Sequence, residues 1–220
     1  MKELQKNFVR FLIDEEVLRF GQFTLKDGRS SPYFLNFGVL STGRQIHEMG
    51  RFFAEGISNL GYLDRVDILF GPAYKGIAIA AATAAAIYTE YGKDLYFAYN
   101  RKERKGHGEG GMVVGIEEGQ SGRVLIIDDV FSGGKSKDEA LRTVKSIPGL
   151  TVEAIIVGVD RQEKGKSGAT ESETYSKKRG LDLLNLVTAG LIATILKEDP
   201  SVAARYSREN LEAFLAHLSA

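Results

Sequence analysis

Two adjacent acids, Asp128 and Asp129, stand between an apolar run and a glycine-rich turn, and this order of residue types predicts a ligand site. The apolar run, residues 124–127, is typical of a strand that is buried on both faces. After the turn at residues 132–134, apolar side chains recur at helical spacing as far as Ile147. The segment is therefore expected to form a strand, an acidic pair, a glycine loop and a helix.

The physical properties of this segment favour a phosphorylated sugar as the ligand. A glycine turn can direct several backbone N–H groups into one concave space, and the start of a helix adds partial positive charge. Such a cradle binds a phosphate. Two carboxylates would repel a bare phosphate, but they suit the hydroxyls of a sugar or a Mg²⁺ ion that bridges to a polyphosphate.

Two other interpretations of the segment are weaker. Acids and glycines are common in surface turns, but here the acids come directly after the apolar run. Residues 134–136 copy the end of a phosphate-binding P-loop, whose first glycine would fall at position 129. That position is Asp129, so the P-loop interpretation fails.

The composition of the chain excludes several classes of protein. Its 220 residues include 29 basic and 29 acidic side chains, so the net charge is zero and nothing favours nucleic acid as a partner. There are no cysteines, and hence no disulfides or thiol chemistry. The N-terminus lacks the apolar core of a signal peptide, and no apolar run reaches the ~18 residues of a membrane span. We therefore expect a single cytoplasmic domain with no membrane partner.

Alternating strand and helix patterns predict an α/β fold with a central, mostly parallel sheet that is flanked by helices. A hairpin with its turn at Asp27-Gly28 is expected between residues 17 and 37. Residues 164–180 are polar and are expected to form an exposed excursion, and His217 lies off the apolar face of the last helix. Strands are expected at 67–70, 95–99, 124–127, 151–159 and 183–187, and helices near the N-terminus and at 42–60, 77–91, 140–147, 189–196 and 208–218.

Four polar segments follow strands of this expected sheet: residues 71–76, 101–111 and 128–136, and Arg161. Ligands of such sheets bind beyond the carboxyl ends of the strands, so the four segments should converge on one site. Residues 101–111 combine cations, a histidine and several glycines, which favours a lid that closes over an anion rather than a plain solvated loop. Four convergent segments predict a site more firmly than any single motif.

The strand, the two acids and the small loop resemble the shared motif of the type I phosphoribosyltransferases. This resemblance implies that the acids hold the ribose diol of phosphoribosyl diphosphate (PRPP) and that the loop holds its 5′-phosphate. Lys135 stands where the family commonly has a hydroxyl. The PRPP-binding residues implied in this segment are Asp128, Asp129, Val130, Phe131, Ser132, Gly133, Gly134, Lys135 and Ser136.

A wider set of motifs, at residues 25–34, 70–76, 101–110 and 160–163, resembles the orotate phosphoribosyltransferase family. The resemblance implies a type I phosphoribosyltransferase fold with a hood formed mainly by residues 1–40, a core at 41–200 and a C-terminal helix at 207–219. It also implies transfer of the phosphoribosyl group from PRPP to N1 of orotate, giving orotidine 5′-monophosphate and diphosphate, in pyrimidine biosynthesis. The cofactor implied is Mg²⁺, and the assembly implied is a homodimer with shared active sites.

The same resemblance assigns roles to individual residues. Further PRPP contacts are expected at Lys26, Tyr74, Lys75, Arg101, Lys102, Lys105 and His107. Contacts to orotate are expected at Phe34, Leu35, Ser132 and Arg161. The expected catalytic residues are Asp128, Asp129, Lys105 and His107. Mg²⁺ is expected to be carried mainly by PRPP, with help from the two acids.

Two alternative functions remain open at this point. A transferase for a purine base is one, because Gly133-Gly134 resembles the loop of the adenine enzyme, but it leaves Arg161 without a role. A non-enzymatic PRPP-binding regulator that kept the fold is the other. Such a regulator should bind DNA through a basic surface, which the zero net charge disfavours.

Overall fold

The structure is a computed structural model that describes residues 1–25, 28–103, 112–165 and 168–219. Its helices are α1 Lys2–Asp14, α2 Gly43–Asn59, α3 Lys75–Tyr91, α4 Lys135–Lys145, α5 Glu171–Arg179, α6 Ala189–Glu198, α7 Pro200–Ala203 and α8 Arg208–Ser219. Its strands are β1 Leu18–Thr24, β2 Ser30–Leu35, β3 Ile68–Phe70, β4 Tyr96–Asn100, β5 Val113–Val114, β6 Gly122–Phe131, β7 Leu150–Asp160 and β8 Asp182–Thr188. In the part of the chain that is described, no helix is long and apolar enough to cross a membrane.

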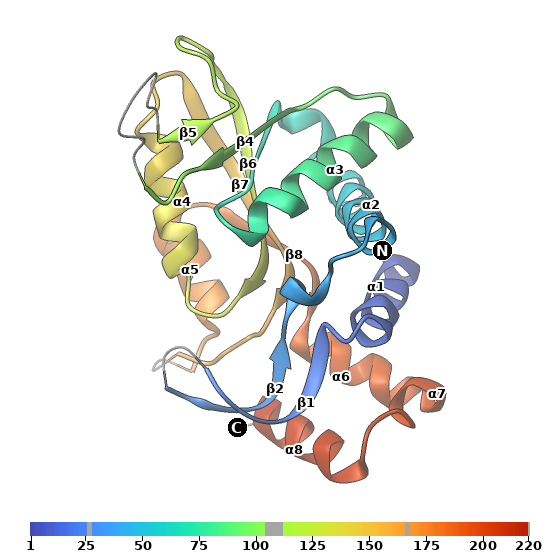
Figure 1. Cartoon of the computed structure of the whole chain (residues 1–220). Helices are drawn as coiled ribbons and strands as arrows, with labels where there is room; N and C mark the ends of the chain where they lie inside the picture. The colour runs from blue at the N-terminus through green and yellow to red at the C-terminus, as the bar shows by residue number, and fades with distance from the viewer. Residues whose placement is uncertain (26–27, 104–111, 166–167, 220) are drawn as a thin grey trace.

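The central sheet has six strands in the order β5-β4-β3-β6-β7-β8 (Figure 1). Strands β4, β3, β6, β7 and β8 run parallel to their neighbours, and β5 pairs with β4 in the antiparallel sense at the edge. Helices α1, α2 and α3 cover one face of the sheet, and α4 and α5 cover the other. The predicted α/β fold with a mostly parallel sheet is therefore confirmed.

Alternating side chains of β6 pack into two separate cores. Leu125 and Ile127 are fully buried in the larger core, to which α1, α2 and α3 contribute. Val124 and Ile126 are fully buried in the smaller core, beneath α4. Because both faces of the strand are covered, its sequence is an unbroken apolar run rather than an alternating pattern.

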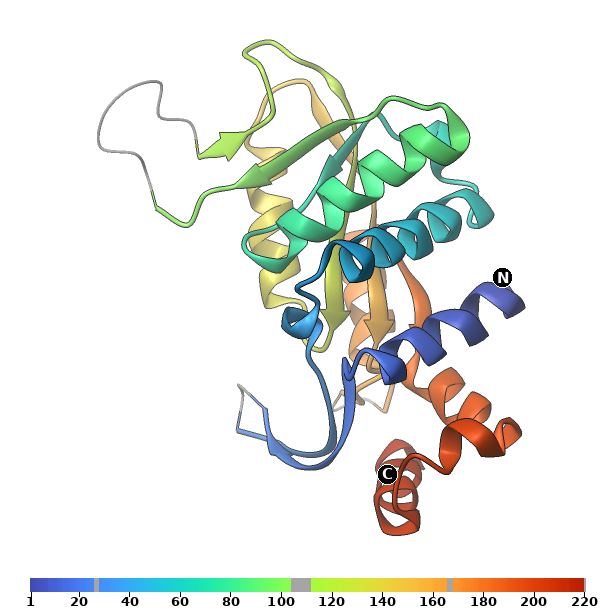
Figure 2. The ribbon, with the colours of Figure 1, turned by 45° about the vertical axis from the view of Figure 1, so that its right-hand side comes forward.

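Strands β1 and β2 form a separate antiparallel hairpin near the carboxyl ends of the main sheet (Figures 1 and 2). Helix α8 packs on this hairpin through Phe214, whose ring centroid lies 5.1 Å from that of Phe20 and 4.8 Å from that of Tyr33. His217 lies 5.9 Å from the ring of Tyr33, so the expectation that it is off the packing face is wrong. The helix supplies the hydrophobic contacts that an isolated two-stranded hairpin lacks.

The structure corrects two expected boundaries. Strand β6 continues through both acids to Phe131, so the acids belong to the end of the strand instead of following it. Residues 164–180, expected to be an exposed excursion, include helix α5, whose Tyr175 is buried 5.3 Å from the ring of Phe131. This polar segment is helical because Thr170 and Glu173 form a reciprocal capping box at its start. The two-residue strand β5 and the single-turn helix α7 were also missed.

Candidate active site

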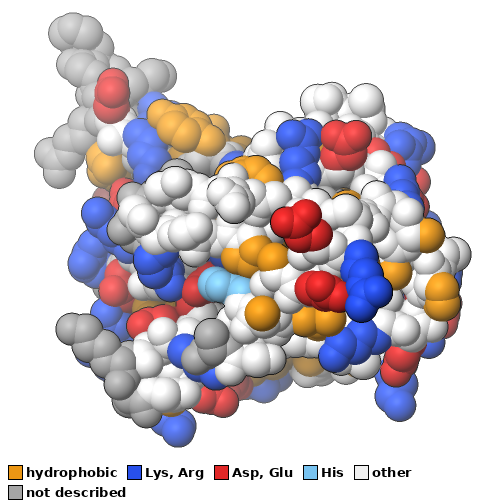
Figure 3. All heavy atoms as spheres, turned by 90° about the horizontal axis from the view of Figure 1, so that it is seen from below, with side chains coloured by type: hydrophobic (Ala, Val, Ile, Leu, Met, Phe, Trp, Pro, Cys, Tyr) orange, Lys and Arg blue, Asp and Glu red, His pale blue; other side chains and the backbone are white. Residues whose placement is uncertain are grey.

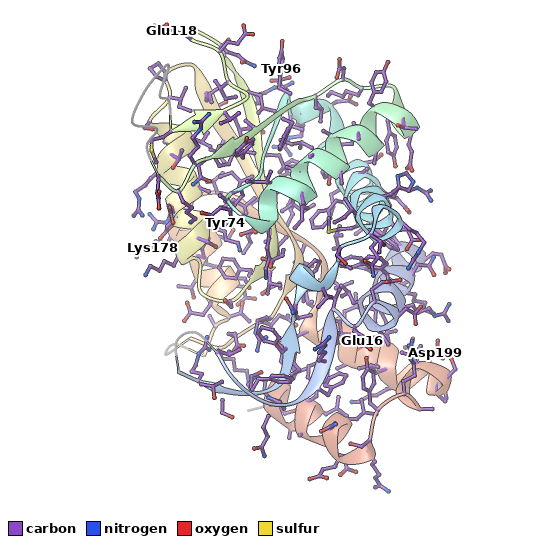
Figure 4. The ribbon with its side chains drawn as sticks, viewed as in Figure 1. Glu16, Tyr74, Tyr96, Glu118, Lys178 and Asp199 are labelled. Carbon is purple, nitrogen blue, oxygen red and sulfur yellow. The ribbon has the colours of Figure 1, made fainter. Side chains whose placement is uncertain are left out.

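The polar segments singled out in the sequence meet at the carboxyl edge of the sheet. They follow β3, β4, β6 and β7, which lie side by side in the sheet, so parallel strands deliver them to one edge. Two labelled tyrosines in Figure 4 mark the two ends of the sheet: Tyr96 begins β4 at one end, and Tyr74 follows β3 at the other. The predicted convergence holds for the described residues of these segments.

The turn between β3 and α3 lies tightly against the edge of the sheet. A Cβ atom added to Gly71 would lie 2.0 Å from the carbonyl oxygen of Gly76, so the close approach of these two backbone segments requires glycine. The backbone N–H of Ala73 donates to Oδ1 of the buried Asn100 at 3.0 Å. Because Asn100 ends β4, this bond joins the two loops to which the resemblance assigns diphosphate contacts.

Two of the expected diphosphate contacts, Tyr74 and Lys75, stand at the start of α3. Tyr74 is 74% exposed and projects from the ribbon (Figure 4). The ammonium of Lys75 lies 2.9 Å from Oδ2 of Asp129 on β6, and the lysine side chain is about half exposed. The ammonium of Lys75 can therefore leave Asp129 and bind an anionic ligand, since charge-assisted hydrogen bonds to phosphate are strong.

The two acids have unequal surroundings. Asp128 is 7% exposed, and its Oδ1 accepts the backbone N–H of Asp129 at 2.9 Å while its Oδ2 accepts the ammonium of Lys137 at 2.7 Å. Burial raises the pKa of Asp128, and the charge of Lys137 opposes that rise. Asp129 is more exposed, and its Oδ1 accepts the N–H of Val130 at 2.7 Å.

The small loop after β6 opens helix α4. Gly134 has a φ of +76°, and a Cβ atom there would lie 2.6 Å from the ring of Tyr175, so glycine is required on both counts. The side chain of Phe131 is buried, which leaves its backbone as the part that can face a ligand. The loop ends at the N-terminus of an 11-residue helix, a favourable place for a phosphate. Its exposed side chains are Ser132, Lys135 and Ser136.

Arg161, the expected orotate contact after β7, is held on three sides. Its Nε donates to Glu163 at 2.8 Å, its Nη2 donates to the hydroxyl of Ser31 at 2.9 Å, and its guanidinium lies 4.1 Å from the ring centroid of Tyr33. Arg161 is 4% exposed, and Arg29 bonds the other oxygen of Glu163 at 2.9 Å. The hairpin thus contacts the arginine directly and fixes its orientation.

The expected base-covering pair on β2 splits between two faces. Phe34 is half-buried and stacks on Phe23 of the neighbouring strand, with ring centroids 5.5 Å apart. Leu35 is 5% exposed, and its side chain lies in the larger core. Successive residues of a strand point to opposite faces, so of these two side chains Phe34 is the one outside the core.

The remaining expected contacts lie in or beside the segment after β4. Arg101 is half-buried at the end of that strand, and Nζ of Lys102 lies 3.6 Å from Oε1 of Glu139 on α4. Lys26, Lys105 and His107 lie outside the described residues. For these three, the roles implied by the resemblance stay predictions.

The surroundings of the acids fit a divalent ion that arrives on a ligand better than a resident one. The described residues contain no group of three or more His, Cys, Asp or Glu side chains that could hold a metal. Asp128 already binds the ammonium of Lys137, and Asp129 binds that of Lys75. An ion bound mainly by ligand phosphates, as Mg²⁺ usually is, needs few protein ligands.

Sequence reasoning missed several residues that support the site, and one of them carried a readable signal. Lys137 stands at helical spacing with Ala140, Leu141 and Val144, so it belongs to the apolar face of α4, where a lysine calls for a buried partner. Asn100 and Ser31 act through contacts with distant elements, and Glu163 contacts both the distant Arg29 and the nearby Arg161. No local pattern in the sequence reveals such contacts.

Comparison with known proteins identifies a broad domain family and, within it, a narrower family to which the chain belongs. Residues 40–179 match the phosphoribosyl transferase domain family, and the chain belongs to that family. It is 41% identical to the orotate phosphoribosyltransferases of Salmonella arizonae, over 92% of this chain and 93% of that one, and of Pseudomonas fluorescens, over 92% of both. The crystal structure of orotate phosphoribosyltransferase from Francisella tularensis matches with a TM-score of 0.78 and 32% identity, covering 96% of both chains. Within its class, the chain is a member of the orotate phosphoribosyltransferase family.

Proposed function

We propose that the chain transfers the 5-phosphoribosyl group of PRPP to N1 of orotate, giving orotidine 5′-monophosphate and diphosphate in pyrimidine nucleotide synthesis. The observation that carries this proposal is the grouping of polar residues at the carboxyl edge of the sheet. The acidic pair and the small loop after β6 lie at the end of one strand. Arg161, a fixed cation suited to a carboxylate, follows the neighbouring strand β7. Membership of the orotate phosphoribosyltransferase family supports the same reaction.

In this reaction the bond from C1′ to the diphosphate oxygen breaks, a bond from C1′ to N1 of orotate forms, and the proton of N1 passes to the leaving diphosphate or to water. The electron pair leaves with the diphosphate, so positive charge develops on the ribose ring. The protein then acts by positioning and by charge stabilisation, without a covalent intermediate. We assign the ribose hydroxyls to Asp128 and Asp129 and the 5′-phosphate to the loop after β6. The leaving diphosphate is assigned to Tyr74 and to six cationic residues: Lys26, Lys75, Arg101, Lys102, Lys105 and His107.

In this proposal Mg²⁺ would be carried mainly by the diphosphate of PRPP and would neutralise part of the leaving charge. The acid that can approach it is Asp129, because Asp128 is buried against Lys137. The carboxylate of orotate is assigned to Arg161, and the base is assigned to Ser132, which is exposed, and Phe34, which is half-buried.

A spectrophotometric assay tests the reaction itself. Purified protein with PRPP and Mg²⁺ should consume orotate and should consume neither adenine nor hypoxanthine, because the purines lack the carboxylate that Arg161 would bind. Consumption of a purine without consumption of orotate would replace this proposal by the purine-base alternative. No turnover of any base, together with binding to DNA, would favour the regulator, although basic and acidic side chains are interspersed on the face drawn in Figure 3.

We further propose that the working form is a homodimer in which residues 101–111 of one chain reach the site of the other. The composition of this segment supports the proposal, because it is too polar to bury much surface against its own chain. A two-fold arrangement would deliver both segments equally, one to each site.

Subunit exchange between two variants that are each nearly inactive alone, assayed at low orotate, should restore activity if the sites are shared. Lys105→Ala and Arg161→Ala would each damage every site of their own dimers. A mixed dimer would hold one doubly damaged site and one intact site. Random exchange of equal amounts makes half of the dimers mixed, so activity should return to about a quarter of wild type. If residues 101–111 serve their own chain, every site carries one lesion and mixing restores nothing.

A further inference from the structure

Lys137 is a buried cation to which the reaction described above gives no role. It lies in the first turn of α4 and is 3% exposed. Lysine is almost never fully buried without a partner, because removing its charge from water is costly. Its neighbours on the same helical face are Ala140, Leu141 and Val144, which belong to the smaller core.

The ammonium of Lys137 joins three parts of the candidate site. It lies 2.7 Å from Oδ2 of Asp128, it donates to the carbonyl oxygen of Val130, and its own backbone belongs to the helix that the phosphate loop opens. The hydroxyl of Ser136 lies 3.5 Å from the same carboxylate oxygen. The end of β6 and the start of α4 are therefore tied together across the loop by one charged group.

We propose that Lys137 is the positioning residue of the ribose and 5′-phosphate site, holding Asp128 and the loop after β6 in their binding arrangement before PRPP arrives. This inference rests on the proposed function. The ammonium binds one oxygen of Asp128 and thereby fixes the rotation of the carboxylate, so that the other oxygen keeps a lone pair for a ribose hydroxyl. A site arranged in advance binds more tightly, because its ordering cost is met during folding.

The geometry also divides the work of the two acids. Asp128 is an internal brace whose counter-ion is permanent, since Lys137 and Asp128 are both buried. Asp129 is partly exposed, and its counter-ion Lys75 is free to turn to a ligand. The acid pair therefore carries about one net negative charge beside the ribose instead of two, which lowers its repulsion of the 5′-phosphate.

Equilibrium binding of two ligands to the folded protein tests the inference. Ribose 5-phosphate contains the diol and the phosphate that Lys137 would organise, whereas diphosphate is assigned to residues that follow β3 and β4. Lys137→Met should weaken ribose 5-phosphate by about tenfold or more, as expected for the loss of one charge-assisted contact, and should leave diphosphate within about twofold. Lys145→Met, which replaces an exposed lysine in the last turn of the same helix, is the matched control and should change neither ligand.

A chemical rescue separates the charge of Lys137 from its volume. The chain has no cysteine, so Lys137→Cys introduces a single thiol, which can be alkylated in denaturant before refolding. Aminoethylation rebuilds a side chain of lysine length with an ammonium at its end, and propylation gives a neutral side chain of similar size. The aminoethyl form should recover ribose 5-phosphate binding, and the propyl form should resemble Lys137→Met.

Each outcome decides between a positioning role and a merely structural one. Selective loss of ribose 5-phosphate, restored by aminoethylation alone, supports the inference. Equal loss of both ligands, unchanged binding, or failure of every neutral form to fold assigns Lys137 to the core and overturns it. If the wild-type protein binds neither ligand, the proposed function itself fails. That result differs from a failure of the inference about Lys137, in which the wild-type protein still binds both ligands.

Discussion

Replacing Arg161 with alanine should raise the KM for orotate by about 100-fold or more and should change the KM for PRPP by less than about threefold. The reason is that Arg161 is a buried cation whose orientation is fixed by Ser31, Glu163 and Tyr33. A fixed cation pays little ordering cost when it meets a carboxylate, and a buried one is poorly screened by water. Steady-state kinetics with each substrate varied in turn gives the two constants separately.

The chain offers a matched control for this variant in Arg65. Its guanidinium lies 4.3 Å from the ring centroid of Tyr62 and 3.1 Å from Glu153, so it reproduces the stacking and the ion pair of Arg161. Arg65 directly precedes the segment that leads into β3, at the amino edge of the sheet, and is half exposed. Arg65→Ala should leave both KM values unchanged. Equal increases for orotate and PRPP in Arg161→Ala would show that the arginine supports the whole site and does not select the base.

Replacing Asp129 with asparagine should lower kcat by about 100-fold to 1,000-fold, the usual range for losing one electrostatic contact to a transition state. In the proposed reaction, the carboxylate of Asp129 would stand beside the ribose, where positive charge would develop as diphosphate leaves. Asparagine has the same shape and can still accept the N–H of Val130, so the end of β6 should keep its structure. Kinetics at saturating PRPP, together with thermal unfolding, separates the lost charge from any lost stability.

Asp67 provides the control for this second variant. Its carboxylate is bound by Arg123 at the amino end of the sheet, and these hydrogen bonds lower the pKa of Asp67 to about 2. Asp67→Asn removes an equally well-paired charge far from the ligand edge, so it should change kcat by less than about twofold. A normal kcat in Asp129→Asn would contradict the role proposed for the acid and leave Asp128 as the only acid at the ribose.

Much of the architecture was predictable because the periodicity of the sequence reflects burial. The continuous apolar run of β6 predicted a strand covered on both faces. The helix expected at 42–60 corresponds to α2, which begins after a capping box between Thr42 and Gln45. Helix α5 was missed because its sequence offers a single large apolar residue, Tyr175. Its capping box at Thr170 was the signal that could have revealed it.

The polar supports of the site were less predictable, since they depend on contacts between distant segments. Ser31 and Arg161 are 130 positions apart, and their hydrogen bond exists only once the hairpin lies against the end of β7. Sequence patterns located the site at the carboxyl edge of the sheet because the segments that follow parallel strands all emerge at that edge. They could not foresee that Lys137 would pair with Asp128 or that Glu163 would orient Arg161.

The packing of α8 on the hairpin has a consequence for the order in which the protein acquires its active form during synthesis. Domains begin to fold from the N-terminal side while the ribosome is still adding about 5–20 residues per second. All strands of the sheet have been synthesised once residue 188 is added. Phe20 and Tyr33 lack their packing partner until Phe214 has been synthesised. A nascent chain can therefore complete its sheet and phosphate loop before Tyr33, which stacks on Arg161, gains its last support. The base end of the site should be the final part to mature after release from the ribosome.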